Sequence, residues 1–102
     1  MLNEAPGATA IQAVNDLVAI GAANILLNQG LIIPRDMSIV GFGNVLVSEH
    51  FRVPLTTIRQ PKFRLGTAAM ELMLKLLRGE PAGSKRLPAE LVIRQSTAPP
   101  PP

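Results

Sequence analysis

Two short apolar runs with a helical segment between them constrain the fold of this chain more than any other feature. The runs span residues 8–14 and 38–42, and turn-forming residues follow each of them. Residues 16–29 are predicted to form a helix, because a short polar residue precedes them and Gly30 follows where a left-handed cap belongs. A strand, a helix and a second buried strand make a β-α-β unit with parallel strands and a right-handed crossover.

The rest of the chain continues with the same kinds of element. Residues 44–54 are predicted to be a loop that contains the single histidine, and residues 55–58 a short extended piece. A helix is predicted over Lys62–Leu77, because leucine and alanine recur along one face of it. A last strand is expected at residues 90–95. The fold class that follows is α/β, built on a parallel sheet.

The length of 102 residues allows one domain with a single core. We expect a leader over residues 1–7, the domain over residues 8–98 and a proline tail over residues 99–102. The N-terminus lacks the basic start and the apolar core of a signal peptide, and no stretch approaches the roughly 20 apolar residues of a membrane helix. These features predict a cytoplasmic chain with no membrane partner.

Composition argues against several classes of function. The chain has no cysteine and one histidine, His50, and its carboxylates show no paired spacing. We therefore predict no metal site, no cofactor and no enzymatic activity. The net charge of +3 is scattered along the chain, and aromatic residues make up only 3% of it. Both features argue against DNA binding by this chain itself.

Polar and turn-forming residues follow the two apolar runs of the β-α-β unit. Asn15 comes after the first run, and Gly43 and Asn44 come after the second. Because the carboxyl ends of neighbouring parallel strands meet at one edge of a sheet, a ligand is expected at that edge. Asn15 or Asp16 also caps the helix, and we interpret Asp16 mainly as such a cap.

Four segments, taken in order and spacing, resemble the C-terminal part of bacterial LacI/GalR-type transcriptional regulators. They are AVNDLVAIGA (13–22), GLIIPRDMSIVGFGN (30–44), PLTTIRQP (54–61) and ELVIRQSTAPP (90–100). The resemblance implies a fragment of a periplasmic-binding-protein-like type I fold, with a sugar or similar small metabolite as effector. It also implies that DNA is bound only through an N-terminal headpiece, which these residues do not include.

The resemblance also carries over to single positions. Asn15 matches an asparagine that contacts the effector in the family, and capping and contact are compatible roles. Gly43 stands where the family usually has an aspartate, in a GFDD or GYDN pattern, so a usual effector ligand is missing here. Asn44 is expected to substitute for it in part. Lys62 matches a variable position near the cleft, although an exposed lysine at a helix start is the simpler interpretation.

Two further positions, Ile20 and Phe51, match the dimer face of the family. The helix over residues 16–29 supports that placement independently, because it is apolar over most of its circumference and needs neighbours on more than one side. Self-association is therefore expected. Two alternatives stay open beside the regulator: a fragment of a transport-type sugar-binding protein, and a fragment that dimerises but no longer binds an effector.

Overall fold

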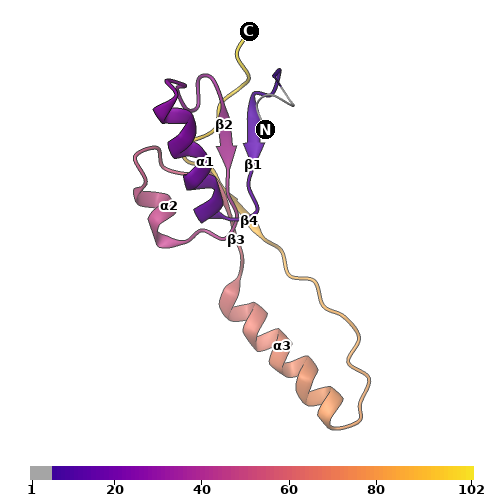
Figure 1. Ribbon diagram of the computed structural model, residues 1–102. Helices are drawn as coiled ribbons and strands as arrows, with labels where there is room; N and C mark the ends of the chain where they lie inside the picture. The colour runs from indigo at the N-terminus through magenta and orange to yellow at the C-terminus, as the bar shows by residue number, and fades with distance from the viewer. Residues whose placement is uncertain (1–5) are drawn as a thin grey trace. The chain divides into compact units, whose positions relative to one another are not determined.

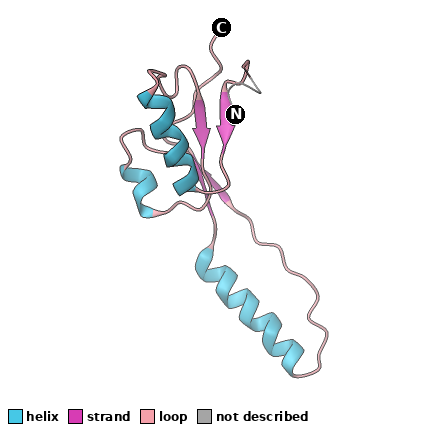
Figure 2. Ribbon diagram, viewed as in Figure 1, coloured by secondary structure: helices cyan, strands magenta, loops and turns pink. Residues whose placement is uncertain are grey.

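A computed structural model describes residues 6–102, which divide into two compact units. The first unit contains the described residues up to Arg59 together with residues 91–102, and the second contains Gln60–Glu90. The elements are β1 (Ala10–Gln12), α1 (Asp16–Asn28), β2 (Ser38–Val40), α2 (Leu46–His50), β3 (Thr57–Arg59), α3 (Lys62–Leu77) and β4 (Glu90–Val92) (Figure 1; Figure 2). The expected leader lies mostly outside the described residues.

The first unit contains the predicted β-α-β unit. Strands β1 and β2 pair in parallel, with Ile11 opposite Ile39, and α1 connects them (Figure 1). The strands are shorter than predicted, but the backbone bonds continue beyond them, since Ala13 N donates to Val40 O at 2.9 Å. On its other side β2 meets the chain leading into β3, where Val40 and Thr56 form a parallel bridge. Strand β4 pairs with β3.

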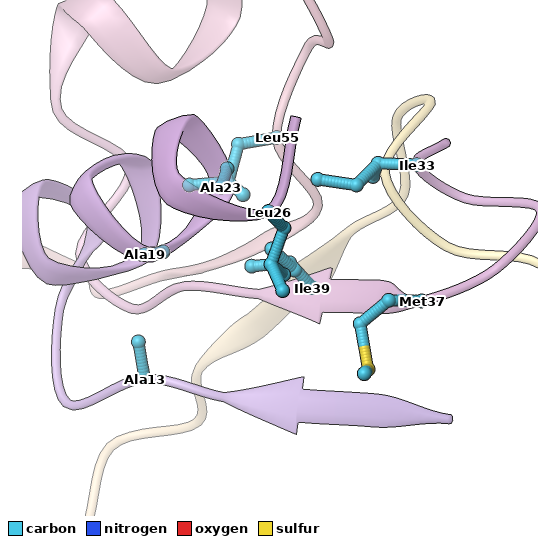
Figure 3. Packing of buried hydrophobic residues seen from close by; sticks show 8 residues of the cluster. All are labelled: Ala13, Ala19, Ala23, Leu26, Ile33, Met37, Ile39 and Leu55. Carbon is cyan, nitrogen blue, oxygen red and sulfur yellow. The ribbon is translucent and has the colours of Figure 1, made fainter. Parts of the chain in front are cut away.

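The core lies between α1 and the strands. The buried residues of α1 are spaced three, four and three apart, and they are Asp16, Ala19, Ala23 and Leu26. The two alanines allow the helix backbone to approach the sheet closely, because an alanine side chain is only a methyl group. Figure 3 shows Leu26 extending to Ile39 on β2, with Met37 and Leu55 in the same cluster.

The opposite side of α1 is open to solvent. Leu17, Val18 and Ile25 are 66%, 51% and 60% exposed. Ile20 and Phe51, the two predicted interface residues, are half-buried and pack against the core of their own chain. The helix is therefore covered on one side only, and its outer surface remains apolar.

The prediction of a loop over residues 44–54 is wrong in part, because Leu46–His50 form the short helix α2. No side chain caps its start. Instead, Ser48 N and Ser48 Oγ both donate to Val45 O, at 3.0 and 2.6 Å. Ser48 is fully buried. Packing against residues far away in the sequence therefore stabilises α2, and the residues of α2 alone give no clear helix signal.

The second unit consists of α3 and the segment after it. Helix α3 spans Lys62–Leu77, the range that the sequence predicts. Only Ala68 is buried on it, while Phe63 is 87% and Leu76 60% exposed. A groove of about 530 Å³ runs along the helix between Lys62 and Leu74. No helix within residues 6–102 is long and apolar enough to cross a membrane.

Candidate functional site

Asn15 lies between β1 and α1 and caps the helix. Its backbone is extended, with φ −155° and ψ 175°, and its Oδ1 accepts a hydrogen bond from Val18 N at 2.9 Å. The predicted cap is therefore confirmed. The side chain is exposed, so its Nδ2 group is accessible to solvent at the carboxyl edge of the sheet.

Asp16 is not the cap that the sequence suggested. Its side chain is fully buried and points into the fold. One carboxylate oxygen accepts from Thr57 Oγ1 at 2.6 Å and the other from Val45 N at 2.8 Å. The residue therefore joins the start of α1 to β3 and to the start of α2. This one carboxylate therefore links turns that form the edge.

Gly41 is the residue that lets Asp16 take this position. A Cβ atom on Gly41 would lie 2.3 Å from Asp16 Oδ1 and 2.8 Å from Leu55 Cδ2. Any other residue would force the carboxylate or the strand to move. The apolar run that ends at residue 42 therefore contains a glycine for reasons of close packing.

The turn after β2 has two consecutive residues with positive φ. Gly43 has φ +118° and Asn44 has φ +56°, conformations that suit glycine and asparagine. Gly43 N donates to Ile58 O at 2.9 Å, and Asn44 N donates to Thr57 Oγ1 at 3.3 Å. The space next to Gly43 is open, since a Cβ there would meet nothing within 4 Å. Gly43 is thus a turn residue, and because it has no side chain it also leaves an open space at the edge, called below the gap at Gly43.

Arg94 belongs to this site, although the sequence analysis did not single it out. Its guanidinium donates to Asn44 Oδ1 at 2.7 Å, and to Ser48 Oγ and Leu55 O at 3.0 Å each. It lies 50 residues beyond Asn44 in the sequence. The only available signal was its place in the segment ELVIRQSTAPP, which carries the family resemblance without stating a role.

Lys62 is not part of the first unit, which contains the residues described above. It is the first residue of α3, it is exposed, and it belongs to the second unit. Its role in effector binding remains a prediction.

Ionisable groups elsewhere in the described chain form no further site. Asp36 lies beside Arg35, whose guanidinium, together with a hydrogen bond from Ile32 N, holds the pKa of Asp36 below its usual value. That pair is on the surface between α1 and β2. Residues 6–102 contain no group of three or more possible metal ligands.

These features define the class of the molecule: part of an α/β domain built on a parallel sheet, with polar residues gathered at its carboxyl edge. The chain belongs to the family of periplasmic binding protein-like domains, which it matches over residues 1–97. The relatives below place it, more narrowly, as a fragment of a LacI-family effector-binding domain, as the four sequence segments predict.

Among curated proteins, the transcriptional repressor CytR of Escherichia coli (strain K12) is 41% identical over 91 residues, which cover 87% of this chain and 27% of CytR. The lac repressor dimer bound to operator and the anti-inducer ONPF has a TM-score of 0.84 at 37% identity. That match covers 95% of this chain and 34% of the lac repressor chain.

A LacI family regulator from Enterococcus faecium, solved with bound ribose, has a TM-score of 0.80 at 37% identity. The match covers 95% of this chain and 37% of the regulator. This chain therefore spans about a quarter to two fifths of the length of these relatives. The relatives are transcriptional regulators and not enzymes.

Proposed function

We propose that this chain is the effector-sensing and dimerisation portion of a LacI/GalR-type transcriptional regulator. In the intact protein it binds a sugar or similar small metabolite with Asn15, Asn44 and the gap at Gly43, and Lys62 contributes from the start of α3. The observation that carries the proposal is the convergence of Asn15 and Asn44 at one sheet edge, where Asp16 joins the turns that hold them.

The mechanism follows from the links among these turns. A ligand that contacts both asparagines binds best when the start of α1 and the turn after β2 keep one relative position. It therefore shifts the population toward conformations with that arrangement, in proportion to its difference in affinity between them. In the intact regulator, this shift changes the affinity of a separate headpiece for DNA. The chain itself is neither an enzyme nor a DNA-binding module, and it functions in the cytoplasm without a cofactor.

The proposed dimer surface is the outer side of α1. Leu17, Val18 and Ile25 are exposed there, and Ile20 and Phe51 lie beside the core that supports them. Burying apolar side chains of this size contributes roughly 1.5–3 kcal/mol each.

A fragment that only dimerises is the second candidate, and the missing acceptor at Gly43 favours it. A transport-type binding protein is the remaining alternative, and a signal peptide encoded upstream would support it.

Asn15→Ser in the intact regulator separates the two roles of this residue. Serine also caps helices well, so the melting temperature should stay within about 2 °C, while the affinity for the effector should fall at least tenfold because the amide donor is lost. Calorimetry with ribose, lactose and acidic sugars measures the affinity. Asn28→Ser, at the last residue of α1, is the control and should leave binding unchanged. Equal affinities of wild type and Asn15→Ser for every ligand would contradict the effector role.

A further inference from the structure

The polar side chains at the carboxyl edge of β1 and β2 have their acceptor atoms occupied within the fold. Asn15 Oδ1 accepts from Val18 N at 2.9 Å, and Asn44 Oδ1 accepts from Arg94 at 2.7 Å. The one carboxylate of the edge, Asp16, is fully buried, and each of its oxygens already accepts a hydrogen bond. Each of these four oxygens already accepts one hydrogen bond within the fold, so the edge offers few unused acceptors.

Hydrogen-bond donors, in contrast, remain unused. They are Nδ2 of Asn15, Nδ2 of Asn44 and Nε of Arg94, and none of them bonds to a residue within 6–102. No side-chain nitrogen or oxygen of the described residues is both buried and without a partner. Asn15 is exposed, and the unpaired nitrogens of Asn44 and Arg94 are not fully buried, so the edge presents donors on side chains from three separate segments.

The charge at the edge also favours an anionic ligand. Arg94 is half-buried and forms no ion pair with any residue from 6 to 102; its three partners are neutral oxygens. A partly desolvated cation without a counterion is costly, and an anion placed beside it offsets that cost. The fully buried Asp16 carboxylate accepts from Thr57 Oγ1 and Val45 N and forms no hydrogen bond with Arg94.

We infer that this edge binds the acid group of an anionic metabolite, a carboxylate or a phosphate, and that it binds neutral polyols much more weakly. The inference rests on the proposed effector role and names the class of effector. Each hydroxyl of a neutral sugar accepts hydrogen bonds but also brings a proton that needs an acceptor, whereas an ionised acid group only accepts and supplies a counter-charge for Arg94. Gly43 contributes no side-chain acceptor, and the space next to its Cα is open.

Three ligands with one carbon skeleton test this inference on the 102-residue chain: ribose, ribonate and ribose 5-phosphate, at fixed ionic strength. Two-dimensional NMR spectra report the Nδ2 signals of Asn15 and Asn44 and the Nε signal of Arg94. We expect saturable shifts of these signals with at least one of the two acids, and at least tenfold weaker binding of ribose. The acid that binds tighter distinguishes a carboxylate from a phosphate ligand.

Asn44→Asp is the decisive variant. Aspartate has nearly the same shape, tolerates the positive φ of this position and keeps the bond to Arg94 as an ion pair. It should leave the fold intact and weaken acid binding at least tenfold. Asn24→Asp is the matched control, because Asn24 Oδ1 also accepts from an arginine, Arg52, at 3.0 Å on the exposed surface. It changes the net charge equally and should leave acid binding unchanged.

The outcomes separate the inference from the function on which it rests. Ribose binding at these signals as tightly as either acid would overturn the preference for an acid group and leave the effector role standing. No saturable shift with either acid would overturn the inference, while the effector role of the intact regulator is tested separately by calorimetry on Asn15→Ser. Equal loss of acid binding in Asn44→Asp and Asn24→Asp would show that only the overall charge matters, and would also overturn the inference.

Discussion

The carboxyl edge of the first unit and helix α3 of the second differ in how they obtain their structure. At the edge, bonds between residues far apart in the sequence join the turns, and Asp16, Thr57 and Arg94 are 29 to 50 residues from most of their partners. Helix α3 has one buried residue, Ala68, and its bounds follow from its own sequence. The turns at the edge are thus held by bonds within this chain, whereas α3 exposes an apolar surface that no described residue buries.

The largest expected effect comes from removing the carboxylate that joins the turns. Asp16→Ala leaves Thr57 Oγ1 and Val45 N without acceptors, and hydrogen bonds to a charged group contribute roughly 1.5–3 kcal/mol each. We expect the free energy of unfolding to fall by about 3 kcal/mol or more. The chain has no tryptophan or tyrosine, so urea unfolding is best followed by far-UV circular dichroism.

Asp36→Ala is the control for this loss. Asp36 is also an aspartate that accepts a backbone hydrogen bond, from Ile32 N at 2.8 Å, but it lies on the surface. Water replaces the lost bonds there, so the change in stability should be far smaller. Similar losses for the two variants would contradict the view that Asp16 organises the edge.

The sequence predicted the parts of the molecule that depend on local signals. The range of α3, the cap at Asn15 and the parallel β-α-β unit are confirmed. These features could be predicted because periodicity, capping and the order of strands and helices depend on residues close together in the sequence. Helix α2 was missed because Ser48, the buried residue that anchors it, receives a bond from Arg94, 46 residues away. Asp16 was misread as a cap because its partners are equally remote in the sequence.

Gly43 shows the same limit within the candidate site. The family resemblance identified a missing aspartate, but only the structure gives the φ of +118° at this position. An aspartate there would have to leave that conformation and change the turn that positions Asn44. The glycine is therefore tied to the shape of the turn as well as to the loss of an acceptor, and sequence alone shows only the second.

One substitution made in both regions gives effects of opposite sign. Gly41→Ala places a Cβ 2.3 Å from Asp16 Oδ1 and should destabilise the first unit by about 1–3 kcal/mol. Gly66→Ala lies in exposed α3, where a Cβ meets nothing within 4 Å, and should stabilise the helix by about 1 kcal/mol. Hydrogen exchange of amides in each unit measures both changes. Destabilisation of α3 by Gly66→Ala would mean that its surface is already covered.

The uncovered surfaces lead to the last prediction, that the chain self-associates. Helix α3 exposes a stripe that includes Met73, Leu76 and Leu77, at 50%, 60% and 74%. Leaving large apolar side chains exposed forgoes roughly 1.5–3 kcal/mol each, a large share of the 5–15 kcal/mol that stabilises a small domain. A second copy of the chain supplies a surface of the same kind. We therefore expect a dimer or larger oligomer, observable by light scattering across a dilution series.

Two substitutions at equal exposure distinguish which surface drives the association. Ile25 on α1 and Leu76 on α3 are both 60% exposed, so replacing either with glutamate costs the fold little and places a charge on one surface. We expect Leu76→Glu to raise the dissociation constant at least tenfold, and Ile25→Glu to raise it less, because α3 has one buried residue whereas α1 has four and already packs one side against the core. A larger effect of Ile25→Glu would assign the association to α1 and the proposed dimer surface. A folded wild-type monomer at high micromolar concentration would contradict both, and would mean that exposed apolar side chains on these two helices are tolerated without a partner.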